Sequence, residues 1–411
     1  MRAFTCVPRQ HRLASGENEA WRQQLNGLQQ ITYALHTSLF PLDPYLASMP
    51  LPPMTGHLEP RRRLSQAART GKLPQVLLVT GPAGIGKQRL ALWLAQLVLC
   101  LHPAGEPCGR CRSCRLVADL AHADVHWFVP ILRPKAAEAG KQIEEAAEAL
   151  AVVMEERRAK PLYPQPDGMA GHPIAVVRLL QRSAGLTSVE GGRRVYIVGE
   201  AERLVPQESS QEAANALLKL LEEPPPGSLF VLTSVDARRL LPTMRSRAVP
   251  VRLNRLSDAE VGEFLRQQLD PAPSPGELAE RVALGAGSIG QALRAGEESD
   301  KAYRAAGQLL EAILQGTGPT LERALKQAPW SARGEFTAML DALADTLGEA
   351  ARESLGQPTR RPVPPALRRR SDPTPLLKAM EHVAEAREAA WGNVNPQILL
   401  AVLGQDLAEA L

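Results

Sequence analysis

A phosphate-binding pattern occupies the segment from Gly81 to Gln88, which reads Gly-Pro-Ala-Gly-Ile-Gly-Lys-Gln. In such a loop the backbone N–H groups surround the phosphates and the lysine reaches the outer ones, while a following Ser or Thr holds Mg²⁺. Here the pattern is intact through Gly84, Gly86 and Lys87, but Gln88 stands in place of the hydroxyl. The segment therefore predicts a phosphate cradle that lacks one metal ligand.

Four of the five cysteines fall close together, and they are Cys100, Cys108, Cys111 and Cys114. Four sulfurs around one tetrahedral ion suit structural Zn²⁺, and in an intracellular chain clustered cysteines favour a metal over disulfides. An iron–sulfur cluster and reduced buried thiols are the alternatives. Because a four-cysteine site leaves no open coordination position, we expect it to brace a loop and not to catalyse.

Acidic residues follow a second apolar run, Arg194 to Gly199. In a hydrolysing phosphate-loop enzyme the corresponding strand ends in Asp-Glu, where the Asp supports Mg²⁺ and the Glu polarises the attacking water. Gly199 stands where the Asp belongs, so Glu200 has no metal partner and Mg²⁺ binding is not expected. The alternative is that Glu200 and Glu202 only begin a solvated helix.

The elements needed to position these groups are present in the sequence. An apolar run from Pro74 to Thr80 precedes the glycine loop, and apolar residues recur at helical spacing from Gln88 to Leu101. Strand, loop and helix are the context that a phosphate loop requires. A tight turn that binds nothing is the alternative.

Composition sets the outer limits. The 411 residues are 44% hydrophobic and 22% charged with a net charge of +4, which suits a globular protein of two or three domains. No apolar stretch is long enough to cross a bilayer, and the N-terminal residues do not form a secretory signal. We therefore expect a cytoplasmic protein without a membrane partner.

Further motifs follow toward the C-terminus. The run from Gln211 to Pro226 predicts an amphipathic helix that prolines terminate, Leu229 to Ser234 predicts a strand, and Arg245-Ser-Arg247 comes after it. Taken in order, the motifs resemble the delta-prime family of bacterial clamp-loader subunits. The segments that carry the resemblance are Thr55–His57, Gly71–Pro74, the phosphate loop, the four cysteines, His122–Trp127, Glu190–Arg194, Ala214–Pro225 and Arg245–Arg247.

The resemblance implies an α/β fold of the AAA+ class, with a RecA-like parallel sheet and a zinc module, followed by a small helical lid and an all-α collar. The domains it implies are the RecA-like domain over 54–253 with a zinc module at 100–114, a lid over 254–296 and a collar over 297–411. Two stretches depart from the family: an N-terminal extension over 1–53, expected to be disordered, and an insertion at 131–173. We expect the insertion to contain a helix from Lys135 to Lys160, and the sequence assigns it no function.

The resemblance also implies a role. The chain is expected to join gamma/tau and delta subunits in a pentameric ring that loads the sliding clamp onto primed DNA, as part of DNA polymerase III. Ser246 and Arg247 match the pair that presents an arginine finger in trans to a gamma/tau ATP site, where a guanidinium stabilises the charge of phosphoryl transfer. The alternative for Arg247 is a surface or capping arginine.

Intrinsic ATPase activity is not expected, because Gln88, Gly199 and Gly290 replace the Ser or Thr, the Asp and the nucleotide-sensing Arg of an active subunit. Binding of ATP or ADP without hydrolysis is left open, and so is whether the chain is itself an enzyme. The competing functions are an active gamma/tau-like ATPase and a nucleic-acid-binding zinc protein with a vestigial loop. For His122, Asp124 and His126 we expect a structural role, with a metal set as the alternative.

Overall fold

The computed structural model describes residues 51–160, 170–190, 192–204, 211–295, 297–327, 333–368, 372–390 and 394–411. Contacts divide the chain into two units, and the second, Met49–Leu411, contains all of these residues. The predicted extension lies outside the described residues except for Leu51 to Pro53. The description below concerns the second unit.

A five-stranded parallel sheet forms the centre of the N-terminal part. Its strands are β1 (Val76–Thr80), β2 (Val125–Phe128), β3 (Arg194–Val198), β4 (Ser228–Ser234) and β5 (Val249–Arg252), in the order β2-β3-β4-β1-β5. The strands β3 and β4 are buried throughout, as expected for apolar runs covered on both faces. Since β1 lies between β4 and β5, the loop that follows it opens where the strand order reverses, which is the usual ligand position in such sheets.

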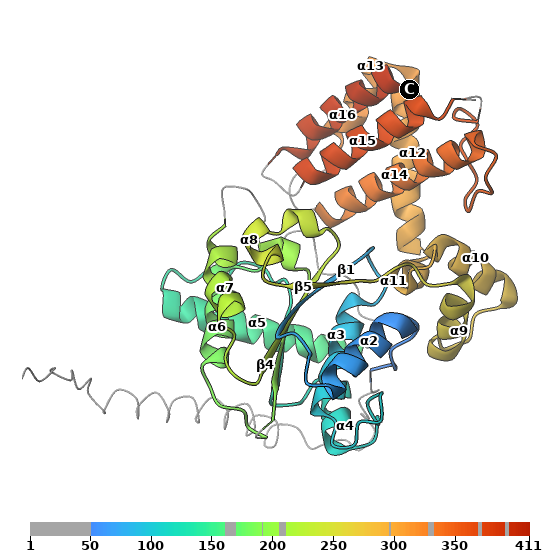
Figure 1. Ribbon diagram of the computed structural model, residues 1–411. Helices are drawn as coiled ribbons and strands as arrows, with labels where there is room; N and C mark the ends of the chain where they lie inside the picture. The colour runs from blue at the N-terminus through green and yellow to red at the C-terminus, as the bar shows by residue number, and fades with distance from the viewer. Residues whose placement is uncertain are drawn as a thin grey trace, which may run out of the picture. The chain divides into compact units, whose positions relative to one another are not determined.

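Helices flank this sheet in two groups. In Figure 1, α6 and α7 lie to the left of the strands, whereas α2, α3 and α4 lie to their right. The helices of this part are α2 (Leu58–Arg69), α3 (Lys87–Leu99), α4 (Arg112–Ala118), α5 (Ala139–Ala159), α6 (Ile174–Ala184), α7 (Glu212–Glu222) and α8 (Pro242–Arg245). The predicted strands and helices around the glycine loop are confirmed, and so are the helix in the insertion and the helix that prolines terminate.

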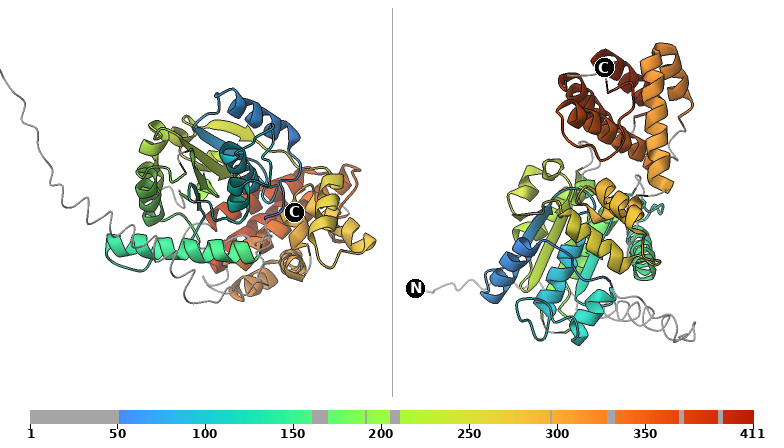
Figure 2. Two further views of the ribbon diagram at one scale, coloured as in Figure 1. Left: turned by 90° about the horizontal axis from the view of Figure 1, so that it is seen from below. Right: turned by 90° about the vertical axis from the view of Figure 1, so that its right-hand side faces the viewer.

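Two further helical groups have cores of their own. The helices α9 (Asp258–Gln268), α10 (Pro275–Gly285) and α11 (Ile289–Arg294) surround a small core, and Ser257 caps α9 in a capping box with Glu260. A bundle of α12 (Glu297–Gln315), α13 (Thr317–Leu325), α14 (Arg333–Ser354), α15 (Thr374–Ala389) and α16 (Pro396–Ala410) contains the other core (Figure 2).

The α/β fold with a parallel sheet, followed by a small and then a larger helical group, is therefore as predicted. The boundaries of the domains stay a prediction. Among the helices of the described ranges, none combines the length and the apolar character that crossing a membrane requires.

Candidate nucleotide site and metal cluster

The glycine loop has the backbone of a phosphate cradle. Gly84 and Gly86 have φ angles of 73° and 97°, in the left-handed region that side chains disfavour, and α3 begins directly after Gly86. These angles turn the chain sharply from the end of β1 into the first turn of α3. The predicted loop is therefore formed, with its lysine at the first position of the helix.

Lys87 is engaged by its own loop. Its Nζ donates to the carbonyl oxygens of Gly81 at 2.9 Å and Pro82 at 2.7 Å, and the side chain is buried. Burial lowers the pKa of Lys87 to about 8, although the nearby carboxylates of Glu202 and Glu200 act in the opposite direction. The lysine thus has hydrogen-bond partners within the protein in the place where a phosphate would provide them.

Gln88 and Gly199 lie against each other. A Cβ atom at position 199 would lie 2.8–2.9 Å from the Nε2, Cδ and Oε1 atoms of Gln88, closer than Cβ atoms come to other groups. The amide of Gln88 therefore fills the space from which a carboxylate at position 199 would project. The two predicted departures at positions 88 and 199 are thus sterically linked, because the side chain of Gln88 occupies the space that Gly199 leaves open. The residues present do not fit Mg²⁺.

Arg157 approaches the same place from the insertion. Its Nη1 donates to Gln88 Oε1 at 3.3 Å, and its guanidinium carbon lies 4.1 Å from the centroid of the Trp127 ring. Arg157 is only 3% exposed. The ends of the insertion are held together by two hydrogen bonds between Ile131 and Gly171, of 2.8 and 2.9 Å. Sequence reasoning missed Arg157, because an arginine near the end of a charged helix usually faces solvent.

Glu200 and Glu202 do not begin a solvated helix, so that alternative is wrong. Glu200 has a φ of 53° and forms a 2.7 Å ion pair with Arg203. Burial raises the pKa of Glu200, and Arg203 partly offsets that effect. Glu202 is buried and its Oε1 accepts a hydrogen bond from Val235 N at 3.2 Å. Both acids belong to the interior beside Lys87.

The first helix turn after Ser288 contacts the phosphate loop directly. Ser288 Oγ donates to Ala83 O at 2.9 Å, and Gly290 N donates to Gly84 O at 2.9 Å. A Cβ atom at position 290 would lie 2.7 Å from the Cα atom of Gly84. Gly290, which the family resemblance places at the nucleotide-sensing position, therefore permits a backbone contact that a side chain would prevent.

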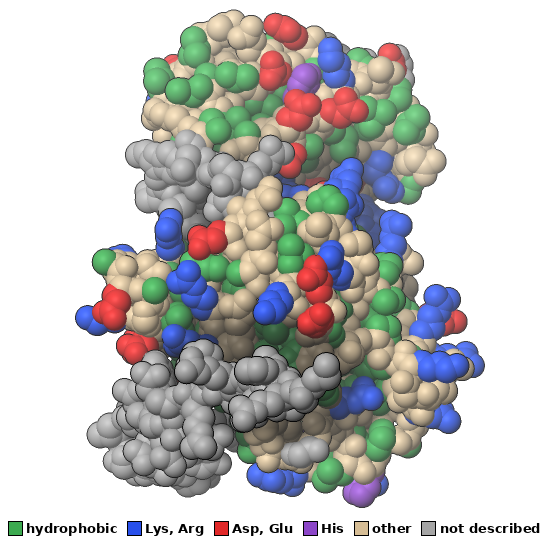
Figure 3. Space-filling model, turned by 60° about the vertical axis from the view of Figure 1, so that its left-hand side comes forward, with side chains coloured by type: hydrophobic (Ala, Val, Ile, Leu, Met, Phe, Trp, Pro, Cys, Tyr) green, Lys and Arg blue, Asp and Glu red, His purple; other side chains and the backbone are tan. Residues whose placement is uncertain are grey.

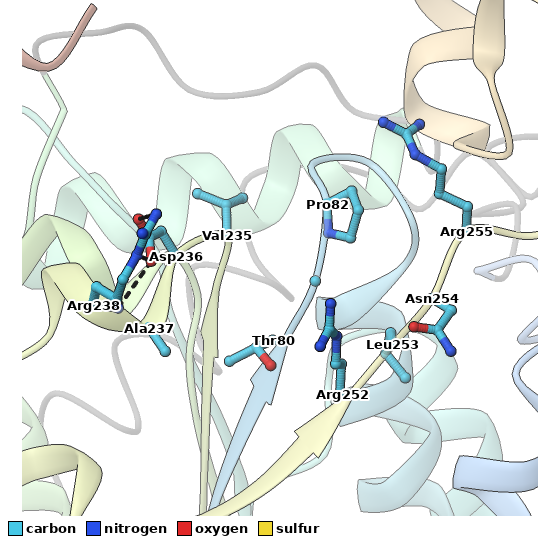
Figure 4. Close-up of a pocket in the computed structure, with 11 residues that line it drawn as sticks. Thr80, Pro82, Val235, Asp236, Ala237, Arg238, Arg252, Leu253, Asn254 and Arg255 are labelled. Atoms are coloured by element: carbon cyan, nitrogen blue, oxygen red, sulfur yellow. Dashed lines mark hydrogen bonds and ion pairs between the residues drawn. The ribbon is translucent and has the colours of Figure 1, made fainter. Parts of the chain in front are cut away.

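A pocket of 640 Å³ opens at the carboxyl ends of β1, β4 and β5 (Figure 4). Arg238, Arg252 and Arg255 line it, and neither Lys87 nor Gln88 does so in the described part of the chain. Arg238 forms an ion pair with Asp236, and Arg255 donates to the carbonyl of Ala286. Among the described residues that line this pocket, Arg252 is the arginine that has neither an ion pair nor a hydrogen bond of this kind. The pocket shares Gly81 and Pro82 with the contacts of Lys87, whose own side chain lies outside its lining.

The four predicted cysteines converge. Their Sγ atoms all lie within 4.8 Å of one another, and tetrahedral zinc with Zn–S bonds of about 2.3 Å places its sulfurs about 3.8 Å apart. Hydrogen bonds from the backbone N–H groups of Arg110 and Cys111 are the main cause that lowers the pKa of Cys108 to about 6, which favours a thiolate. The cluster can hold one metal ion, and its donor set fits Zn²⁺.

The cysteine loop is fastened to two helices. Glu106 Oε2 accepts hydrogen bonds from Trp93 Nε1 at 2.6 Å and from Arg61 Nη2 at 2.7 Å, while Ser65 Oγ donates to Gly105 O at 2.5 Å. These bonds connect the loop to α2 and α3. A metal here would therefore brace the outer side of the helix that begins with the phosphate lysine.

His122 and Asp124 share the partner Glu190, whereas His126 contacts a different residue: His122 Nε2 lies 3.5 Å from Glu190 Oε2, and Asp124 N donates to His122 Nδ1 at 3.1 Å. Asp124 accepts hydrogen bonds from Ser188 Oγ and from the backbone N–H groups of Val189 and Glu190, at 2.8–3.0 Å. His126 stacks on Tyr196 with ring centroids 5.1 Å apart. Within the described ranges, the four cysteines are the group with the geometry of a metal site. The structural role predicted for these three residues agrees with their contacts.

Ser246 and Arg247 lie at the end of α8, on the surface. Arg247 Nη1 donates to Thr243 O at 2.7 Å, and Nη2 pairs with the carboxylate of Glu222 at the end of α7. The side chain of Arg247 is 31% exposed. Sequence reasoning did not find Glu222 as the partner of Arg247, although it predicted the proline-terminated helix α7 to which Glu222 belongs.

Comparisons with known proteins agree with this architecture. A family model described as DNA polymerase III, delta subunit, matches residues 57–257. The DNA polymerase III subunit delta' of Pseudomonas aeruginosa is 30% identical over 267 residues, which are 64% of this chain and 67% of that protein. A tau/gamma subunit from Haemophilus influenzae is 24% identical, over 70% of this chain and 39% of its own.

The matched part spans between 44% and 67% of the length of the delta-prime relatives. A solved structure of a gamma subunit-related protein from Thermotoga maritima aligns with a TM-score of 0.35 and 17% identity, over 84% of this chain and 98% of that one.

The parallel sheet, its glycine loop and the helical group resting on that loop define a phosphate-loop module of the AAA+ class. The sequence comparisons identify one family within this class. The chain belongs to the family of DNA polymerase III delta-prime subunits.

Proposed function

We propose that this chain is a delta-prime subunit of the clamp loader that does not hydrolyse ATP itself and offers Arg247 to the ATP site of a neighbouring gamma/tau subunit. Its family supports this role. The observation that carries the non-hydrolysing part is the contact of Gln88 with Gly199, because it fills the place of a metal-binding carboxylate.

Arg247 suits a contact with a partner's nucleotide. Its guanidinium is partly exposed and anchored at one end by Thr243 O, so little side-chain freedom is lost on binding. In this arrangement Glu222 serves as the resting partner of the guanidinium and the γ-phosphate of the neighbouring ATP replaces it. An arginine in that position stabilises the charge that develops during phosphoryl transfer.

The wider assembly is part of the same proposal. The chain joins gamma/tau and delta in a pentameric ring through the collar over 297–411, and the ring loads the sliding clamp onto primed DNA in the cytoplasm. Zn²⁺ at the four cysteines acts as a structural ion. The lid over 254–296 rests on the phosphate loop, and Lys87 keeps its loop carbonyls as partners unless ATP or ADP displaces them.

The test is ATP hydrolysis by the reconstituted clamp loader with clamp and primed DNA. Arg247→Ala is expected to lower the contribution of the adjoining gamma/tau site by about 10³-fold or more, the usual effect of losing an arginine finger. Arg245→Ala, at the end of the short helix that precedes Arg247, is the matched control and keeps the rate. Equal rates for Arg247→Ala and the unchanged chain in a fully assembled complex contradict the proposal.

An active ATPase of the gamma/tau kind is the second candidate, and the tau/gamma relative is the observation in its favour. The purified chain alone decides between the two, since hydrolysis abolished by Lys87→Ala would make this subunit a motor. Nucleic-acid binding through a basic surface has less support. On the face drawn in Figure 3, Lys and Arg side chains are dispersed among acidic and apolar ones.

A further inference from the structure

A buried arginine lies beside the phosphate loop, and the proposed function assigns it no role. Arg157 comes from α5, in the insertion between β2 and β3, and its side chain is almost fully buried. The aromatic face of Trp127 supports its guanidinium on one side. Such a desolvated, stacked guanidinium is fixed in place and not a solvated surface charge.

Its surroundings are those of a metal position. Arg157 donates to Gln88, the residue in place of the metal-binding hydroxyl, and the Gln88 amide lies against Gly199, in place of the metal-binding carboxylate. Glu200 follows directly in the chain, and the charges of Arg157 and Lys87 both stabilise its carboxylate. The positions of the two metal ligands are thus occupied by a glutamine and a glycine, and the guanidinium of Arg157 contacts that glutamine.

We propose that Arg157 takes the place of the divalent cation at this phosphate loop and, together with Gln88, excludes Mg²⁺ from it. Restoring the two missing ligands is then insufficient to restore a metal site. The guanidinium repels a second cation beside it and pairs with any carboxylate placed at position 199. The insertion thereby acquires a purpose, which is to deliver a permanent positive charge to the loop.

The experiment restores the metal ligands with and without this arginine. The full chain carries Gln88→Thr with Gly199→Asp, alone or combined with Arg157→Met. Binding of Mn²⁺ in the presence of ADP is followed by the electron paramagnetic resonance of free Mn²⁺. We expect the Arg157→Met combination to bind Mn²⁺ about tenfold or more tightly than the ligand-restored chain, because one like charge has been removed from beside a partly buried site.

Arg158→Met in the same ligand-restored chain is the matched control. Arg158 is the next residue of α5, but its guanidinium donates to the carbonyls of Asp119 and Leu120, away from Gln88. This control is expected to bind Mn²⁺ as weakly as the ligand-restored chain. Equal gains from Arg158→Met and Arg157→Met, or no gain from either, would overturn the proposal.

Folding of each variant is checked by circular dichroism, and Arg157→Gln replaces Arg157→Met if the latter does not fold. A folded Arg157→Gln combination that gains no Mn²⁺ affinity also overturns the proposal. The inference rests on the proposed non-hydrolysing role, and the unchanged chain separates the two. Metal-dependent ATP hydrolysis by the unchanged chain alone refutes that role. If the unchanged chain does not hydrolyse ATP and the Arg157→Met combination gains no Mn²⁺ affinity, only the part assigned to Arg157 is refuted.

Discussion

A methyl group at position 199 tests the contact that replaces the metal ligands. In Gly199→Ala the new Cβ would lie 2.8–2.9 Å from the amide atoms of Gln88. Those atoms are the free end of a side chain, so we expect Gln88 to move while the backbone stays in place. The movement separates Gln88 Oε1 from the Arg157 guanidinium, to which it is bonded at 3.3 Å.

The cost follows from that lost bond. A hydrogen bond to a charged group contributes about 1.5–3 kcal/mol to stability, so Gly199→Ala should lower the free energy of unfolding by about 2 kcal/mol. In a Gln88→Ala background the space is open, and the same change should cost almost nothing. The two changes should therefore show a coupling energy of about 1–2 kcal/mol in a double-mutant cycle.

Urea unfolding followed by tryptophan fluorescence measures these values, because Trp93 and Trp127 are both buried in the core around the sheet. Gly192→Ala is the matched control, since a Cβ at that position meets nothing within 4 Å. It should change stability by less than about 0.5 kcal/mol. Additive effects of Gly199→Ala and Gln88→Ala, within about 0.5 kcal/mol, would refute the steric link between the two positions.

Three other measurements test the site and its supports. Burial lowers the pKa of Lys87 from 10.5 to about 8, so the unfolded chain binds the proton more tightly than the folded chain. Lys87→Met should therefore stabilise folding by up to about 3 kcal/mol at pH 7. This gain, measured by urea unfolding, should vanish as the pH rises from 8 to 10.5. Gly290→Ala forces a Cβ atom against the phosphate loop and should lower the free energy of unfolding by about 1–3 kcal/mol. Gly307→Ala lies at an open helical position and should raise the free energy of unfolding by up to about 1 kcal/mol. Calorimetric unfolding distinguishes the two signs. We expect metal analysis to find zinc in the purified chain, Cys111→Ser to lose it and Cys6→Ser to keep it; equal zinc content in both variants contradicts the four-cysteine site.

Local patterns explain what the sequence predicted well. The apolar runs of β1, β3 and β4 are continuous because both faces of a parallel sheet are covered, and the glycines between β1 and α3 are required by backbone angles that other residues avoid. The cysteines Cys108, Cys111 and Cys114 also lie within a few residues of one another, so their spacing already indicated that they share one metal ion. Each of these predictions depends on neighbours in the chain.

Contacts between distant segments could not be predicted in this way. Gln88 and Arg157 are 69 positions apart, and the bond from Ser288 to the phosphate loop spans 205 positions. Nothing in the insertion distinguishes Arg157 from Arg158, because adjacent arginines near the end of a helix look alike until the helix is packed. The partner of Arg247 was missed for the same reason, since Glu222 and its neighbour Glu223 are the same residue type.

The sequence by itself determined the chemical inventory of this protein: a phosphate loop with its lysine, three departures from the residues of an active ATPase, four cysteines spaced for one metal ion and the arginine that we propose as a finger. Tertiary structure decided what those residues do to one another. It turned the lysine onto the carbonyls of its own loop, filled the place of a missing carboxylate with Gln88, and brought Arg157 beside it. The physical reason is that side-chain volume and charge act through space, and the packing of α5 against the sheet region sets distances that residue spacing along the chain does not contain.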